Sequence, residues 1–273
     1  MTGKLFLVAT PIGNLEDITF RAINVLKEVD IIAAEDTRHT LKLLNHYGIS
    51  KPLISYHRHN EEIKTDILID KLLEGKNIAV VSDAGTPGIS DPGEEVVKEA
   101  IKNNIEIVPI PGACALVNAL IASGLNTKEF TFFGFLPLNK KNRDNMLNKI
   151  KKARGTVILY EAPHKLLKTL QDLLKNIGNI ECVLAREITK IHEEFIRDNI
   201  SNLLEQIQEP KGEYVILLDL NNLENENEDE ISQKTVEEQY KIYESQGMSK
   251  KDIIKQIAKN KNVPKNEIYK LFI

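Results

Sequence analysis

The sequence has no tryptophan and only two cysteines, Cys114 and Cys182. They lie far apart and neither has a C-x-x-C partner, so we expect neither a disulfide framework nor a zinc site, and a reducing cytoplasm fits. No run of about eighteen apolar residues occurs, so no transmembrane helix is expected. The start, Met1 to Lys4, leads straight into a short apolar strand, and we expect no signal peptide.

Several common site motifs are also missing. There is no Walker A loop, no G-x-G-x-x-G after the first strand and no G-x-S-x-G. His57 and His59 are two residues apart and would face opposite ways on a strand, so no metal site is expected. The loop Thr10 to Asn14 follows the first strand but lacks the glycines that let a pyrophosphate sit on a helix end.

What is present describes a folded protein of more than one domain. The chain has 273 residues, 42% hydrophobic and 28% charged, which suits two domains with a small appendage. The net charge of −4 gives no overall basic field for nucleic acid, but the charge is unevenly spread.

Short apolar strands alternate with amphipathic helices along the first 221 residues. This pattern predicts mostly parallel sheets with helices on both faces. We place a junction at Pro111-Gly112, before a very apolar helix, and so predict two α/β domains, 1–111 and 112–221. An acidic linker, 222–233, then leads to a basic helical domain, 234–273.

One loop stands out. The apolar strand Ile78 to Val81 ends in a run of small residues, Ser82 to Gly93. Asp91-Pro92-Gly93-Glu94 then has the composition of a helix start with Asp91 as the cap. Loops at the carboxyl ends of strands hold ligands in open α/β sheets. Taken alone, such a loop is more often a simple turn.

Polar or small residues also follow many of the other predicted strands. Since these ends lie on the same side of two successive sheets, the pattern predicts one cleft between two domains. Each residue alone could instead be a helix cap or a surface charge. The clusters are Thr10-Pro11, Glu35 to Arg38, His57 to Asn60, Ser82 to Gly85, Glu161 to His164 and Arg186 to Lys190.

These motifs, in this order, resemble those of the tetrapyrrole-methylase superfamily of S-adenosylmethionine (SAM) enzymes. Within it the chain is similar to the ribosomal RNA methyltransferases, nearly end to end. The resemblance implies two α/β domains with mixed sheets flanked by helices, and SAM bound between them. It also implies a homodimer and methyl transfer to the ribose 2′-hydroxyl of a cytidine in the decoding region of 16S ribosomal RNA. The motifs are Thr10-Pro11-Ile12-Gly13-Asn14-Leu15, Glu35-Asp36-Thr37-Arg38, Ser82-Asp83-Ala84-Gly85-Thr86-Pro87, Pro111-Gly112, Gly134-Phe135-Leu136-Pro137 and Arg186-Glu187-Ile188-Thr189-Lys190.

The resemblance also implies a set of SAM-binding residues, drawn from the loops of both domains. Small residues in the loop after Val81 would let backbone groups reach the methionine part of SAM. The expected residues are Pro11, Ser82, Asp83, Ala84, Gly85, Ile89, Cys114, Ala115, Tyr160, Glu161, Ala162, Gly212 and Glu213.

The catalytic group is less well defined by the sequence. A ribose hydroxyl is a poor nucleophile that needs a base or a nearby cation. Glu35, Asp36 and Lys190 are candidates for the base or a relay, and Arg38 could hold phosphate or stabilise the alkoxide. Each has a structural alternative, an Arg38–carboxylate bridge in particular.

Basic residues on two predicted helices could contact the RNA backbone. A solvated lysine face is the alternative, and two other functions stay open: methylation of a tetrapyrrole or another small molecule, and RNA binding without catalysis. The expected RNA contacts are Lys140, Lys141, Arg143, Lys250, Lys251 and Lys255.

Overall fold

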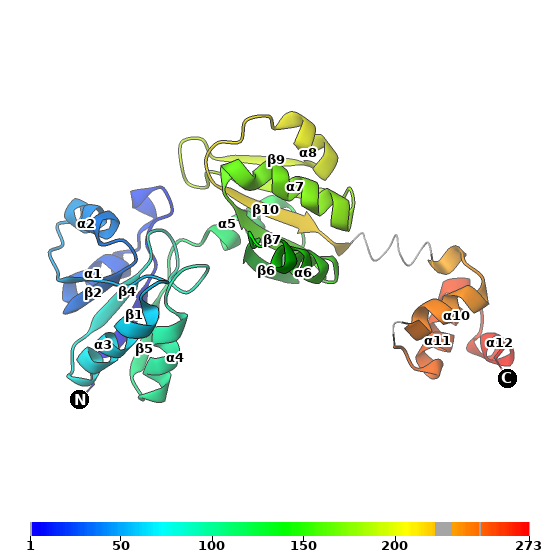
Figure 1. Ribbon diagram of the computed structural model, residues 1–273, viewed down its shortest axis with the longest axis horizontal. Coiled ribbons are helices and arrows are strands. Elements are labelled where there is room, and N and C mark those ends of the chain that lie inside the picture. Colours follow the sequence, from blue (N-terminus) through cyan, green and yellow to red (C-terminus); the bar gives the residue numbers. More distant parts are fainter. Residues whose placement is uncertain (1, 222–230, 246, 273) are drawn as a thin grey trace. The chain divides into compact units, whose positions relative to one another are not determined.

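The computed structural model describes residues 2–221, 231–245 and 247–272. The chain divides into two compact units, Met1–Leu218 and Asp219–Ile273. The first unit contains two five-stranded sheets, and each of the predicted α/β segments contributes one of them (Figure 1). This agrees with the predicted fold class, whereas the exact domain bounds stay a prediction.

The first sheet is parallel in all of its described pairings. Four helices accompany it, α1 (Phe20–Glu28), α2 (Thr37–His46), α3 (Glu61–Leu73) and α4 (Glu94–Lys102), with a short 3-10 turn at Leu15–Asp17. The strand order is β3 (Leu53–Ser55), β2 (Ile31–Ala34), β4 (Ile78–Val81), β1 (Lys4–Val8) and β5 (Glu106–Ile110).

Both faces of this sheet are buried. Side chains alternate across a strand, and in β2 Ile32 packs with α1 and α2 on one face while Ala33 packs with α3 and α4 on the other. The helices therefore cover opposite sides of the sheet (Figure 1). This double burial explains why the strands read as continuous apolar runs.

The second sheet is mixed. Its strand order is β6 (Phe130–Phe135), β7 (Thr156–Glu161), β10 (Tyr214–Asp219), β8 (Glu181–Arg186) and β9 (Glu194–Asn199). Strands β6 and β7 are parallel, whereas β8 is antiparallel to both β10 and β9.

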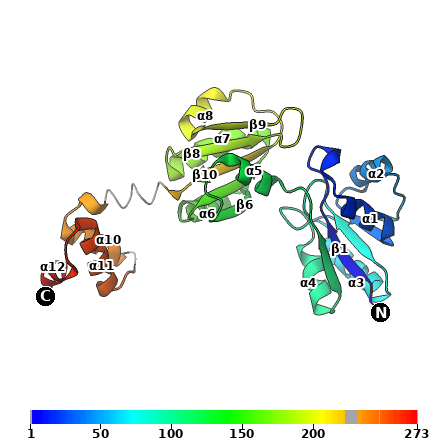
Figure 2. The ribbon, with the colours of Figure 1, turned by 180° about the vertical axis from the view of Figure 1, so that it is seen from behind.

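Helices cover both faces of the second sheet as well. The apolar helix α5 (Ala115–Ser123) packs on the face seen in Figure 2. The face seen in Figure 1 carries α6 (Lys140–Lys151) and α7 (Pro163–Ile177), and α8 (Ile200–Gln206) packs against α7.

The second unit is a small helical domain with its own core. Helices α10 (Val236–Ser245), α11 (Lys250–Lys261) and α12 (Lys265–Lys270) pack around Tyr243, Ile257 and Ile268. Residues 222–230 of the predicted linker lie outside the described residues. Ile231, at the end predicted as linker, packs against this helical core instead.

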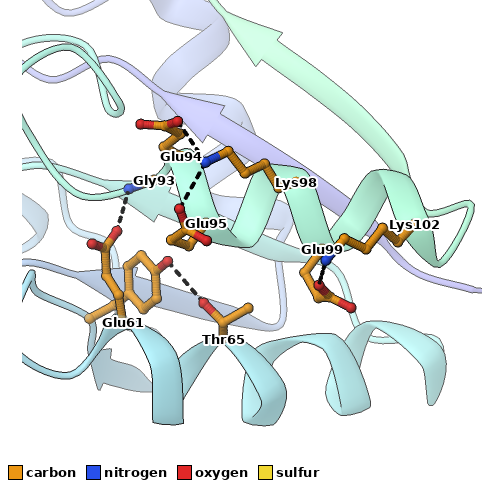
Figure 3. Close-up of polar contacts among 9 residues, drawn as sticks. Glu61, Thr65, Gly93, Glu94, Glu95, Lys98, Glu99 and Lys102 are labelled. Carbon is orange, nitrogen blue, oxygen red and sulfur yellow. Dashed lines mark hydrogen bonds and ion pairs between the residues drawn. The ribbon is translucent and has the colours of Figure 1, made fainter.

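One predicted helix cap is wrong. The residue before α4 is Gly93, not Asp91, and its N–H donates to the carboxylate of Glu61 at 3.0 Å, a contact from α3 that sequence spacing cannot reveal (Figure 3). The cap of α2 is Asp36, whose carboxylate accepts from the N–H of Arg38. Among the described residues no helix combines the length and apolar composition needed to cross a bilayer.

Candidate active site

The loop after β4 is fastened to the loop after β1 by backbone hydrogen bonds. The N–H of Thr10 donates to the Gly85 carbonyl at 2.9 Å, and the N–H of Gly85 donates to the Thr10 carbonyl at 3.1 Å. The hydroxyl of Ser82 donates to the same Gly85 carbonyl, and that of Thr10 donates to the Ser82 carbonyl. Because these polar groups satisfy each other, the small-residue turn is fixed in shape.

A cavity of about 500 Å³ opens over this turn, within the size range of small-molecule sites. Residues from both sheets of the first unit line it, which agrees with the cleft predicted from strand ends. The lining comprises Ile12, Ala84, Gly85, Thr86, Ile89, Ser90, Asp91, Cys114, Ala115, Phe135, Tyr160, Glu161, Ala162, Pro163, His164, Ala185, Ile188, Glu213, Tyr214 and Val215.

Most of the predicted SAM residues line this cavity, and the others do not border it. Ala84, Gly85, Ile89, Cys114, Ala115, Tyr160, Glu161, Ala162 and Glu213 border the cavity, whereas Pro11, Ser82, Asp83 and Gly212 do not. Ser82 is 2% exposed and holds the turn through its hydroxyl. Asp83 accepts the N–H of Asp36 at 2.9 Å, so it joins the loops after β4 and β2.

The second-sheet wall of the cavity is held by buried polar contacts. The hydroxyl of Tyr160 accepts the N–H of Leu116 at 3.0 Å and so fixes the start of α5. Burial raises the pKa of Tyr160, so this phenol stays protonated. Glu161 is only 3% exposed and accepts from Thr169 Oγ1 at 2.5 Å and from the N–H of Ala162 at 2.9 Å. These residues form a preorganised wall.

Lys190 is bound to two carboxylates. Its Nζ lies 2.9 Å from Glu187 Oε1 and 2.8 Å from Glu213 Oε2. Partial burial alone would lower the pKa of Lys190, but its hydrogen bonds to Glu213 and Glu187 outweigh burial and raise it. The stem of Lys190 also lies against Gly13, where a β-carbon would stand 2.4 Å from its Cγ. A protonated, paired lysine is a poor proton acceptor.

The other predicted catalytic residues follow β2, outside the cavity lining. Asp36 pairs with Arg38 at 2.9 Å, the bridge foreseen as the structural alternative, and these hydrogen bonds lower the pKa of Asp36 to about 2. Burial raises the pKa of Glu35, although a hydrogen bond from the Asp83 N–H opposes it. The predicted catalytic roles of these residues stay predictions.

Sequence reasoning missed several lining residues. Asp91, which has the composition of a helix cap, borders the cavity. Phe135 belongs to a family motif and Thr86 to the small-residue loop, and the Thr86 hydroxyl donates to the Ala113 carbonyl at 3.0 Å. His164 belongs to a strand-end cluster, and the sequence gives it no role in a site.

The predicted RNA contacts differ in whether their charged groups are exposed to solvent or paired within the protein. Lys140, Lys141, Lys251 and Lys255 are exposed, and Lys250 is exposed but donates to the Phe272 carbonyl. The Arg143 side chain is only 13% exposed and bridges α6 to α7, with its Nε 2.7 Å from Asp172 Oδ2 and its Nη2 2.8 Å from Thr169 Oγ1. Its RNA contact stays untested.

A sequence profile of the Tetrapyrrole (Corrin/Porphyrin) Methylases matches residues 4–204, which include both sheets except β10. The chain belongs to this family. Within the tetrapyrrole methylases, a Halalkalibacterium halodurans protein named "Ribosomal RNA small subunit methyltransferase I" is 50% identical over 99% of this chain and 94% of its own length. The Bacillus subtilis protein of that name is 48% identical over 98% of this chain and 93% of its own length. A Thermotoga maritima protein of the same name is 46% identical over 79% of this chain and 98% of its own length.

Solved structures share the tetrapyrrole-methylase fold. A diphthine synthase matches with a TM-score of 0.63 at 16% identity, over 79% of this chain and 89% of its own. A uroporphyrin-III C-methyl transferase from Thermus thermophilus, complexed with S-adenyl homocysteine, matches with a TM-score of 0.56 at 16% identity, over 80% of this chain and 98% of its own. At such identity the likeness concerns the fold alone.

Proposed function

We propose that this tetrapyrrole methylase is a SAM-dependent enzyme that methylates the ribose 2′-hydroxyl of a cytidine in the decoding region of 16S ribosomal RNA. The observation that carries the proposal is the near full-length similarity to proteins named "Ribosomal RNA small subunit methyltransferase I". The cytidine and the 2′-oxygen come from the motif resemblance.

The cavity fits a molecule of the charge and shape of SAM. Its lining includes the carboxyl groups of Glu161 and Glu213 and no lysine or arginine among the described residues, which suits a ligand with a sulfonium and an ammonium group. The rings of Tyr160 and Phe135, with centroids 5.7 Å apart, offer apolar surface for an adenine. The absence of basic lining also disfavours the alternative tetrapyrrole acid.

SAM would be held by the turn Ala84–Gly85 from the first sheet and by Cys114, Ala115 and Tyr160 to Ala162 from the second. When bound, it supplies an electrophilic methyl group. The residues of this chain would then orient the acceptor hydroxyl in line with that methyl, which supplies much of the rate enhancement.

RNA would be held by exposed lysines, with Lys140 and Lys141 on α6 and Lys251 and Lys255 on α11 as candidates. The Thermotoga maritima relative bears on the helical unit, because it matches only 79% of this chain over 98% of its own length. The unmatched share is about that of the unit Asp219–Ile273. We infer that SAM binding and methyl transfer reside in the first unit, and that the helical unit adds affinity for the substrate.

The remaining parts of the proposal are a homodimer and a cytoplasmic location. The exposed apolar side chains of Val117 and Ile121 on α5, which are 46% and 68% exposed, would suit a contact between subunits. Sedimentation of the wild type and of Ile121→Glu tests this, because the charge should shift the protein towards monomer.

The function is tested by incubating the protein with methyl-labelled SAM and small ribosomal subunits from a strain that lacks it. We expect label on a single cytidine ribose of the decoding region. Subunits from a strain that has the protein serve as the control and should take up little label. Free 16S ribosomal RNA and a uroporphyrinogen are tested in parallel. Label on the tetrapyrrole alone, or on a base rather than a ribose, would contradict the proposal.

A further inference from the structure

Asp91 is the unengaged acid of the cavity. It is half-buried, and within the described part of the chain no hydrogen bond or ion pair joins its carboxyl to another side chain. The other two lining acids are occupied: Glu161 accepts from Thr169 and Ala162, and Glu213 is paired with Lys190. Asp91 therefore has its lone pairs free for a ligand.

The turn that carries Asp91 is held from two sides. Ser90 has φ of +64°, a left-handed conformation that costs energy for a residue with a side chain. The guanidinium of Arg58 donates to the Ser90 carbonyl, and Glu61 accepts the N–H of Gly93 (Figure 3). From the second sheet, β6 closes on the same turn, since a β-carbon on Gly134 would stand 3.0 Å from Ser90 Oγ. Asp91 is thus presented to the cavity by a rigid support.

The groups around Asp91 are mostly acidic. Burial is the main reason that the pKa of Asp91 rises to about 7, the carboxylates of Glu35 and Asp83 raise it further, and Arg58 opposes them. On the second sheet, Tyr160 interacts electrostatically with the Asp91 carboxylate, and His164 also borders the cavity. A carboxylate with a pKa near the working pH is well matched to proton transfer.

We propose that the Asp91 carboxylate accepts the proton of the ribose 2′-hydroxyl, an inference that rests on the proposed function. The ribose oxygen forms a bond to the methyl carbon while the carbon–sulfur bond breaks and its electron pair goes to sulfur. The hydroxyl proton moves to Asp91, which later releases it to water. Arg58 and Glu61 act as positioning residues that hold the turn, and Glu35 and Asp83 tune the carboxyl.

The test compares the wild type, Asp91→Asn and Asp91→Glu in single-turnover methylation of small subunits across pH 5.5 to 9. For the wild type we expect the rate to rise about tenfold per pH unit and to level off near pH 7. Asp91→Asn should be slower by about 100- to 10,000-fold and should lose that rise. Asp91→Glu should recover part of the rate, because it restores the carboxylate at an altered distance.

A second readout separates proton transfer from cofactor binding. Calorimetric affinity for SAM should stay within about threefold of the wild type in Asp91→Asn, a change of no more than about 0.65 kcal/mol. Asp66→Asn, the same chemical change at an exposed position of α3, is the matched control and should keep the wild-type pH profile. His164→Gln tests the other candidate proton acceptor. If only that variant loses the rise of the rate with pH, His164 rather than Asp91 accepts the hydroxyl proton.

The outcomes distinguish this proposal from the function on which it rests. An Asp91→Asn enzyme that keeps both the rate and the rise near pH 7 overturns the role of Asp91 and leaves the function intact. A rate loss matched by an equal loss of SAM affinity overturns it as well, because Asp91 would then be a cofactor contact. If the wild type transfers no methyl group to ribosomal RNA, both proposals fall together.

Discussion

Replacing Arg143 by methionine should destabilise the first unit without weakening RNA contact. The Arg143 side chain joins α6 to α7 through Asp172 and Thr169, and the Thr169 hydroxyl in turn donates to Glu161 in the cavity wall. Methionine keeps the unbranched stem but removes every donor. The change therefore removes one end of a chain of contacts that reaches the proposed cofactor site.

The magnitude follows from the two bonds that are lost. The 2.7 Å bond to the Asp172 carboxylate is charge-assisted and contributes about 1.5–3 kcal/mol, and the 2.8 Å bond to Thr169 contributes about 0.5–1.5 kcal/mol. Asp172 keeps its ion pair with Lys168, so its carboxylate is not left unpaired. We therefore expect a net loss of about 2–3 kcal/mol, below the full cost of breaking a buried pair.

Differential scanning calorimetry measures this change. A loss of that size lowers Tm by about 5–10 °C in a unit of this length. Lys141→Met, an exposed residue on the same helix, is the matched control and should shift Tm by no more than about 2 °C, in keeping with a surface change below 0.5 kcal/mol. A wild-type Tm for Arg143→Met, combined with a weaker salt dependence of RNA binding, would refute the reasoning and make Arg143 an RNA contact.

The remaining predictions concern the acid in the cavity, the basic helix and the phenol. Asp91→Asn should be more stable than the wild type at pH 8 by about 1–2 kcal/mol. The folded carboxyl, with a pKa of about 7, binds a proton more tightly than the unfolded one, so the wild type loses stability as pH rises from 4 to 7. Thermal scans at pH 4, 6 and 8 should show the difference in stability between the two proteins vanish at low pH, and equal stability at pH 8 would contradict this. Lys140→Ala with Lys141→Ala should lower the slope of log affinity against log salt by about 1–2 while Tm stays unchanged, and an unchanged slope would exclude both as phosphate contacts. Tyr160→Phe removes the acceptor for the Leu116 N–H and should cost about 1 kcal/mol in urea unfolding, whereas an undiminished midpoint would mean that water replaces the hydroxyl.

Much of the fold could be predicted because strand and helix periodicity is local. The apolar run Ile78 to Val81 predicts a strand, and the structure has β4 with those bounds. The predicted cofactor residues that line the cavity came from the family resemblance, and several of them lie at strand ends, where the topology of an α/β sheet brings loops together.

What sequence could not supply were contacts between distant segments. Asp91 has the composition of a cap, but the structure starts α4 after Gly93, whose N–H donates to Glu61. Within the described residues the Asp91 carboxyl then has no hydrogen-bond partner. Likewise the basic residue Arg143 is indistinguishable in sequence from its exposed neighbour Lys141, because the pairing with Asp172 on α7 depends on how two helices pack.

The contact between Gly13 and Lys190 gives residue 13 an influence beyond its own surroundings. Gly13 does not border the cavity, yet any side chain there would displace the Lys190 stem, and with it the ammonium that holds Glu213 in the cavity wall. The Lys190 side chain thus contacts both the loop after β1 and the turn before β10. A substitution at position 13 should therefore alter the affinity for the cofactor. Substitutions at positions 13 and 190 should compensate one another.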